Sequence, residues 1–129
     1  AFASITSALG LNPDSTPVSK KPYYGWGGAM GPAQFIPTTW ILYESAVAKL
    51  TGHTPPSPWN IEDAFTASGL MLAESGANKQ TYASETKAAK IYIAGGRWNT
   101  SLTARIYANN VMATAAKIQN DINILNQSK

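Results

Sequence analysis

Apolar residues recur along this chain at intervals of three and four positions, the spacing that places them on one face of a helix. The strongest example begins at Pro37, which suits the first turn of a helix, and runs to Thr51. Gly52 follows and can end the helix as a C-cap. We therefore predict a centrally packed helix over residues 37–51 with a buried face of Trp40, Tyr43, Val47 and Leu50.

Capping residues and periodic apolar positions predict four more helices. They cover residues 1–9, ended by Gly10; residues 61–76, capped by Asn60; residues 84–94, opened by Ser84; and residues 101–125, opened by Ser101. The expected buried faces are Ile61, Ala64, Phe65, Ser68, Met71 and Leu72 after Asn60, and Tyr107, Val111, Ile118, Ile122 and Leu125 in the last helix. No stretch is typical of a strand, so the prediction is an all-α single domain of about five helices over residues 1–129.

Composition and charge narrow the classes of partner. The chain has 129 residues, 44% of them hydrophobic, which is enough for one modest core. Its net charge is +3, and no run of lysines and arginines resembles a nucleic-acid-binding stripe. The sequence therefore predicts no nucleic-acid partner, while an anionic polymer is an acceptable one. It indicates no oligomeric state.

Cysteine and histidine usage excludes several kinds of site. The chain has no cysteine, which excludes disulfides, thiolate metal sites and cysteine nucleophiles. Its one histidine, His53, excludes a multi-histidine metal site and is interpreted as a solvated loop residue. Glu62 and Asp63 are explained by the first turn of their helix, where the helix dipole favours acids. The sequence predicts no transmembrane segment, and its start lacks a signal-peptide pattern.

One stretch is more specialised than any other. It runs over residues 23–40, and a loop with four glycines in seven residues leads directly into the helix that begins at Pro37. Glycines allow positive φ and close approach of the backbone to a ligand, at an entropic cost. Such a loop indicates a function beyond connecting two elements.

This stretch resembles the lytic transglycosylases, peptidoglycan-cleaving enzymes of the lysozyme-like superfamily. The resemblance rests on Gly28-Ala29-Met30-Gly31, on Gln34-Phe35, and on Pro37 and Trp40, with weaker matches at Asp63-Ala64, residues 91–95, and Tyr107 with Val111. It implies a lysozyme-like helical fold, cleavage of the MurNAc-GlcNAc β-1,4 bond with formation of a 1,6-anhydro-muramoyl end, and no cofactor. It also implies peptidoglycan glycan strands as the partner and an extracytoplasmic location, in the periplasm or the cell wall.

The resemblance also implies a set of substrate-binding residues, namely Gly28, Ala29, Met30, Gly31, Gln34, Tyr92 and Tyr107. The alternative is that the glycines only turn the chain and Gln34 caps the next helix. Ile93 stands where the family has an asparagine, and both tyrosines could equally be core aromatics. Trp26, Trp59 and Trp98 could stack on sugar rings or fill a small core.

The catalytic residue is unknown, because the family's single catalytic glutamate precedes the glycine motif and no such glutamate is present here. The acids are Asp14, Glu44, Glu62, Asp63, Glu74, Glu85 and Asp121, and only Asp14, in a predicted loop, comes before the motif. Glu74-Ser75-Gly76 has the family's Glu-Ser-Gly pattern but follows the motif, so we interpret it as a decoy. Three explanations stay open: the chain is the C-terminal part of a longer enzyme and lacks an upstream catalytic helix, catalysis has been lost, or another acid has taken the role.

Two other classes of function compete with an enzyme. One is a non-catalytic peptidoglycan-binding module that keeps the groove without the acid. The other is a helical interaction or structural domain that shares only the architecture. The glycine-rich loop argues against the second, since a plain helical bundle needs no such loop.

Overall fold

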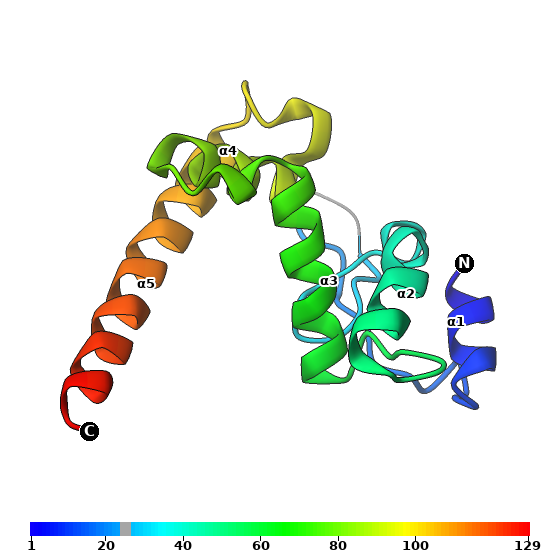
Figure 1. Cartoon of the computed structure of the whole chain (residues 1–129). Coiled ribbons are helices and arrows are strands. Elements are labelled where there is room, and N and C mark those ends of the chain that lie inside the picture. The colour runs from blue at the N-terminus through cyan, green and yellow to red at the C-terminus, as the bar shows by residue number, and fades with distance from the viewer. Residues whose placement is uncertain (24–26) are drawn as a thin grey trace. The chain divides into compact units, whose positions relative to one another are not determined.

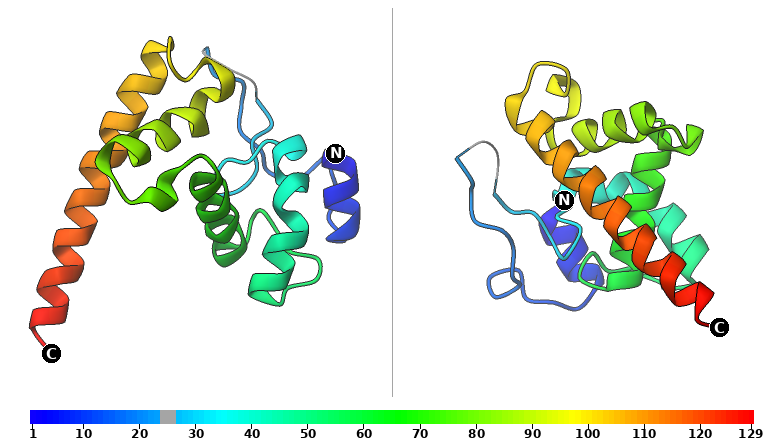
Figure 2. Two further views of the ribbon diagram at one scale, coloured as in Figure 1. Left: turned by 45° about the horizontal axis from the view of Figure 1, so that its top comes forward. Right: turned by 90° about the vertical axis from the view of Figure 1, so that its left-hand side faces the viewer.

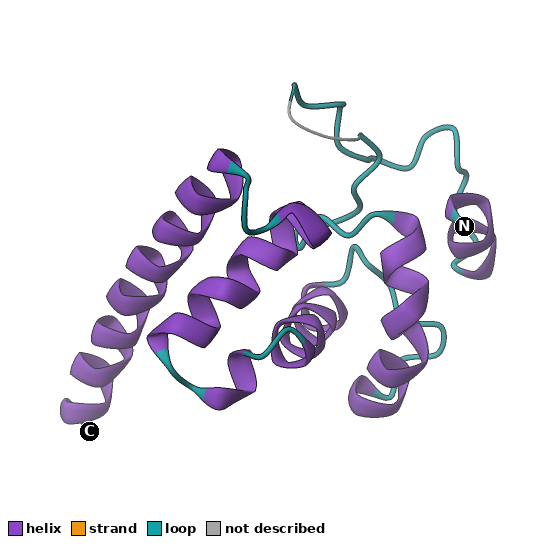
Figure 3. Cartoon of the chain, turned by 90° about the horizontal axis from the view of Figure 1, so that it is seen from above, coloured by secondary structure: helices purple, strands orange, loops and turns teal. Residues whose placement is uncertain are grey.

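The chain is all-α, as the sequence predicts. The computed structural model describes residues 1–23 and 27–129, so Tyr24, Gly25 and Trp26 of the motif lie outside the described residues. Its helices are α1 (Phe2–Ala8), α2 (Pro37–Thr51), α3 (Ile61–Glu74), α4 (Tyr82–Ala94) and α5 (Leu102–Gln127), with the 3₁₀ turns η1 (Ala77–Lys79) and η2 (Gly95–Arg97) (Figure 1). Outside the helices, the described part holds two isolated β-bridges and no strand (Figure 3).

The chain divides into two compact units, Ala1–Met71 and Leu72–Lys129, with the boundary inside α3. The single domain over residues 1–129 stays a prediction.

Three of the predicted capping residues, Gly10, Gly52 and Asn60, lie at the helix ends where the sequence places them. At the end of α2, Gly52 adopts the left-handed conformation with φ +80°. Before α3, the Asn60 Oδ1 accepts hydrogen bonds from the Glu62 and Asp63 backbone N–H groups at 2.9 and 3.2 Å. After α1, Gly10 has φ +66°, and hydrogen bonds from Gly10 and Leu11 to the preceding turn close the helix. Each of these caps depends on residues within about one turn of the helix end, which is why the sequence predicts them well.

The start of α4 differs from the prediction. The helix begins at Tyr82 rather than Ser84, because Thr81 is the cap. The Thr81 Oγ1 accepts from the Ser84 backbone N–H at 3.2 Å, and the Ser84 Oγ accepts from the Thr81 N–H at the same distance. Ser84 is therefore the third residue of the helix, in a reciprocal capping box.

The first unit packs around aromatic and aliphatic side chains from α2 and the loop before it. Trp40 and Val47 of α2 are completely buried, and so is Met30 of the loop. The Phe35 ring meets the Trp40 ring edge-on, with centroids 5.8 Å apart. Leu50 was predicted to share this buried face, but it is 66% exposed, because the core covers only the first three turns of α2.

The buried face of α3 is also different from the predicted one. Ile61 and Phe65 are exposed, whereas Asp63, Ala64 and Ala67 are buried. The Asp63 carboxylate accepts hydrogen bonds inside the unit, which turns positions 61 and 65, about 200° away around the helix, toward solvent. The hydrogen bonds of Asp63, rather than the apolar periodicity, therefore decide which face of α3 is buried.

The second unit is built on the pairing of α4 with α5. Ala88 and Ala89 of α4 and Ala104 and Ala108 of α5 are buried, and these small side chains let the two helices pack closely. The rest of α5 extends past α4 (Figure 2). Its predicted core residues Ile118, Ile122 and Leu125 are exposed, because nothing within this unit covers them.

Among the helices that the structure describes, none is both long enough and apolar enough to cross a bilayer.

Substitution of the buried tryptophan tests this description of the first unit. We expect Trp40→Ala to lower the free energy of unfolding by about 3–5 kcal/mol, because it leaves a large cavity in a completely buried site. Leu42→Ala, on the same helix but 76% exposed, should change it by about 0.5 kcal/mol or less. Chemical denaturation followed by circular dichroism measures both, and equal losses would contradict the assigned core.

Candidate functional site

The glycine-rich loop is tied to the segment before it by short hydrogen bonds. The Gly28 N–H donates to the Ser19 carbonyl and the Ser19 N–H donates to the Ala29 carbonyl, both at 2.8 Å. The Ala29 N–H also donates to the Ser19 Oγ at 3.0 Å. Val18 and Met30 form an isolated antiparallel bridge beside these bonds. The described end of the loop, residues 27–30, is therefore held in one conformation.

A tight turn follows and ends at Phe35. The Met30 N–H donates to the Phe35 carbonyl at 2.9 Å. Gln34 has φ +57°, which is rare for a residue with a side chain. Its backbone N–H and its side-chain Nε2 both donate to the Gly31 carbonyl, at 3.2 and 2.8 Å. These two bonds hold Gln34 in the left-handed conformation.

Gly31 is required by a close approach between two backbones. A Cβ at this position would lie 1.7 Å from the Pro58 carbonyl oxygen, and its φ is +63°. Gly27 is similar, since a Cβ there would lie 2.8 Å from the Lys21 nitrogen. Gly28 differs from both: its φ is +84°, but a Cβ would meet no atom within 4 Å. The open side of the loop is therefore at Gly28.

The five predicted site residues of this loop fall into two groups. Ala29 and Met30 are buried, and Gly31 packs against Pro58, so these three shape the loop. Gly28 borders open space, and Gln34 is exposed. Gln34 is not a helix cap, because Ile36 holds that position before α2 and makes no side-chain cap bond. The helix-capping alternative is therefore wrong.

A buried acid fixes the loop that Gly31 touches. The Asp63 Oδ1 lies 2.7 Å from the His53 Nδ1, and its Oδ2 accepts from the Ser57 backbone N–H at 2.8 Å. An ionised carboxylate can only accept hydrogen bonds, so the His53 Nδ1 carries the proton. Pro58 follows directly and is fully buried. Asp63 thus holds the segment that supplies the contact with Gly31.

This pairing corrects the interpretation of His53 as a solvated residue and of Asp63 as a helix-dipole residue. The His53 side chain is 42% exposed, but it is paired with a carboxylate that is 2% exposed. The sequence contained a signal for it: Asn60 already caps α3, so a second acceptor three positions later was not needed at the helix end.

The pKa values of the two partners shift in opposite directions. The hydrogen bond to Asp63 raises the pKa of His53, and partial desolvation opposes that shift only in part. Burial raises the pKa of Asp63, but the hydrogen bonds from Ser57 and His53 outweigh this effect and hold it below its ordinary value. Both shifts favour the charged pair.

Two of the predicted site residues, Tyr92 and Tyr107, belong to the other unit. They are half-buried on α4 and α5, the two helices that pair there. Of the tryptophans, Trp59 donates its Nε1–H to the Pro17 carbonyl at 2.9 Å and meets Phe2 edge-on, so it has a structural role. Trp98 lines a hollow beside α4, and the Lys87 Nζ lies 5.0 Å from its ring centre. Trp26 lies outside the described residues.

The acids offer no obvious proton donor. Asp63 is the one that is buried, and its lowered pKa is the opposite of what a general acid needs. Asp121 pairs with Lys117 at 3.2 Å on an exposed helix face. The others lie at exposed or half-buried positions: Asp14 in a turn, Glu44 on α2, Glu62 and Glu74 at the ends of α3, and Glu85 in the first turn of α4. In residues 1–23 and 27–129, no three acids or histidines gather as metal ligands would.

A pair of glycine substitutions tests the two roles assigned within the motif. Gly31→Ala should lower the free energy of unfolding by about 3 kcal/mol or more, because the new Cβ collides with a backbone carbonyl and the φ is unfavourable. Gly28→Ala, strained by φ alone, should cost about 1–2 kcal/mol. Denaturation of both purified variants measures the difference. If Gly28→Ala is as damaging as Gly31→Ala, the close approach to Pro58 is not the constraint.

The ion pair predicts a pH dependence of stability. Because the pKa of His53 is raised above 6.5, its contribution is complete below about pH 6.5 and is lost as the pH rises through the folded-state value. Because the pKa of Asp63 is lowered below 3.8, its contribution is lost only on acidification below that value. The melting temperature of the unchanged chain should therefore exceed that of His53→Gln near pH 6, and the gap should narrow by about pH 9.

Tryptophan fluorescence is a suitable measurement, since three of the four tryptophans lie in residues 1–71. A gap that stays constant over this pH range would show that the charge on His53 contributes nothing to folding. Lys49→Gln, an exposed change on α2, controls for a general effect of removing one cation.

Comparison with known proteins gives no relative on which a function could rest. No protein-family model matches the chain, and no curated protein or solved structure matches it. Its function is therefore inferred from its own residues and their geometry.

Proposed function

We propose that this chain is the substrate-binding part of a peptidoglycan lytic transglycosylase of lysozyme-like fold. Its substrate is the MurNAc-GlcNAc β-1,4 bond of the glycan strand, and its product is a 1,6-anhydro-muramoyl end. In this proposal the protein acts outside the cytoplasm, where peptidoglycan is found. The loop over residues 28–34 contacts the glycan, mainly through Gly28 and Gln34.

The observation that carries this proposal is the conformation of Gln34. A residue with a side chain costs about 1–2 kcal/mol in the left-handed region, and such residues cluster at functional sites. Gln34 is exposed, so burial does not compensate that cost. Gln80, the other left-handed glutamine, also ends a turn, and its N–H donates to the Ala77 carbonyl as the Gln34 N–H donates to the Gly31 carbonyl. Gln34 differs from Gln80 in its side-chain hydrogen bond to the turn carbonyl and in lying in a motif that resembles a glycan-binding segment.

The amide of Gln34 keeps capacity for a ligand. Its Nε2 uses one N–H on the Gly31 carbonyl, which leaves a second N–H and the Oε1 acceptor. Acetamido and hydroxyl groups of a sugar can bond to both. Gly28, with open space on its free side, lets a sugar ring come close to the backbone. A few polar groups on a rigid loop are typical of a ligand site.

The chemistry of the proposed reaction needs a proton donor next to this loop. The leaving oxygen takes a proton from a carboxylic acid, and the resulting carboxylate then takes one from the C6 hydroxyl of the muramic acid residue, closing the 1,6-anhydro ring. Such an acid needs a raised pKa, which Asp63 does not have. We propose that a glutamic acid outside residues 1–129 supplies the proton, while this chain binds and orients the glycan.

Gln34→Gly separates ligand binding from stability. The change relieves about 1 kcal/mol of backbone strain and removes one hydrogen bond of about 1 kcal/mol, so stability should change little. Binding to purified peptidoglycan, measured by cosedimentation, should weaken about tenfold, because one amide contact is worth about 1–3 kcal/mol. Gln80→Gly is the matched control and should leave binding unchanged. Unchanged binding in Gln34→Gly would remove the loop from the site.

A non-catalytic peptidoglycan-binding module is the second candidate, favoured because the one buried acid is ion-paired with His53. Product analysis separates the two candidates. The longest natural form of the protein is incubated with purified peptidoglycan, and the soluble products are examined by mass spectrometry. Release of 1,6-anhydro-muropeptides supports the enzyme, whereas cosedimentation without release supports the binding module.

A further inference from the structure

The positive charge of the chain is concentrated in one unit. Residues 72–129 carry seven lysines and arginines against three acids, a net charge of +4. Residues 1–71 carry three against four, a net charge of −1. Attraction to an anion is therefore a property of the unit built on α4 and α5, whereas the glycine-rich loop belongs to the other unit.

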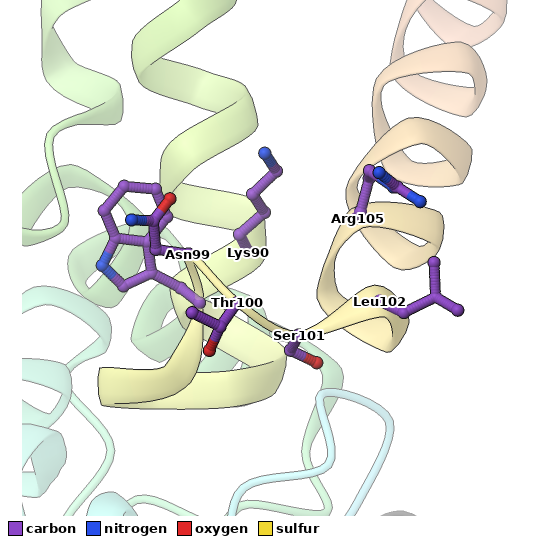
Figure 4. Close-up of a pocket in the computed structure, with 7 residues that line it drawn as sticks. Lys90, Asn99, Thr100, Ser101, Leu102 and Arg105 are labelled. Carbon is purple, nitrogen blue, oxygen red and sulfur yellow. The ribbon is translucent and has the colours of Figure 1, made fainter.

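Two of these cations line one small hollow at the turn between α4 and α5. The hollow has a volume of about 140 Å³ and is lined by Lys90, Leu102, Arg105 and residues 98–101. Lys90 comes from α4 and Arg105 from α5, on either side of the connecting turn (Figure 4). Neither forms an ion pair within the part of the chain that the structure describes. The lining of the hollow therefore includes two cationic side chains without an ion-pair partner among the described residues, and no acid.

A second hollow adjoins the first and has a different character. Its volume is about 450 Å³, and it shares Lys90 and Trp98 with the smaller hollow. The remaining lining is Tyr82, Ala83, Thr86 and Lys87 from the first turns of α4, so most of its surface is aromatic or aliphatic. The Lys87 Nζ lies 5.0 Å from the Trp98 ring centre, which places another cation beside the aromatic ring. Together the hollows offer an anion site next to an apolar one.

We propose that these joined hollows bind the carboxyl-terminal end of a short peptide with small apolar side chains. The carboxylate would lie in the smaller hollow, with Lys90 and Arg105, and the methyl groups against Trp98 and Tyr82 in the larger one. Charge-assisted hydrogen bonds to a carboxylate are the stronger class of polar contact. A nucleic acid is disfavoured because its backbone needs an extended row of cations rather than one pocket. If the proposed function holds, on which this identification rests, the ligand is the peptide stem attached to muramic acid.

The experiment uses N-acetyl-alanyl-alanine with a free carboxylate, its carboxyl-terminal amide, and a single-stranded DNA oligonucleotide. Each is titrated into the isotope-labelled chain, and the NMR signal of the Trp98 indole N–H is followed. The free acid should shift this signal and bind at least about tenfold more tightly than the amide, because only the acid carries a charge opposite to that of Lys90 and Arg105. The double variant Lys90→Gln/Arg105→Gln should lose that preference. Lys90→Arg, which retains the charge, and Lys79→Gln, outside the hollows, should keep it.

Two results would overturn the proposal. Equal binding of acid and amide would mean that the hollows do not recognise the carboxylate. Tighter binding of the oligonucleotide, lost in the same double variant, would assign the cations to phosphate. Because no glycan is present in these titrations, failure here leaves the peptidoglycan test of Gln34 unaffected. Conversely, peptide binding by this chain, together with no release of 1,6-anhydro-muropeptides by the longest natural form of the protein, would keep this site and remove the enzyme proposal.

Discussion

The contact between Gly31 and the Pro58 carbonyl is the constraint on which the first unit depends. It brings two backbone segments closer than any side chain allows, so the loop before α2 and the loop after it must be fixed together. Asp63 achieves this on one side by accepting the Ser57 N–H and pairing with His53. Ser19 achieves it on the other side by pairing with the backbone of the glycine-rich loop. The buried Asp63 carboxylate and the absence of a Cβ at Gly31 thus together fix the loop that carries the exposed residue Gln34.

The sequence predicts the helices well because their ends are determined locally. Gly52, Asn60 and Ser101 act within one turn of their own position, and each ends or opens its helix as expected. Burial is predicted less well because it depends on what lies opposite. Phe65 fits an apolar face by spacing, but the Asp63 anchor turns it outward. Ile122 fits equally well, yet its half of α5 has no neighbour within its unit.

The segment that forms the candidate site was predictable from the sequence. Which of its residues shape the loop and which border open space was not predictable. Nothing in Gly28-Ala29-Met30-Gly31 distinguishes the glycine beside open space from the glycine against a backbone carbonyl. That distinction needs Pro58, which lies far along the chain. The left-handed conformation of Gln34 likewise has no sequence signal, since the residue has no preference for it. The pairing of His53 with Asp63 was missed because both residues had sufficient local explanations.

The long-range contacts of the first unit also have a kinetic consequence. The hydrogen bond from the Trp59 indole to the Pro17 carbonyl joins positions 42 residues apart, and the Phe2 ring packs on the same tryptophan. Closing such loops costs chain entropy before any contact compensates it, which slows folding. The α4–α5 pair joins neighbours in the chain across a short turn. Folding should therefore proceed at two speeds, with the helical hairpin forming first and the glycine-rich loop reaching its final shape last.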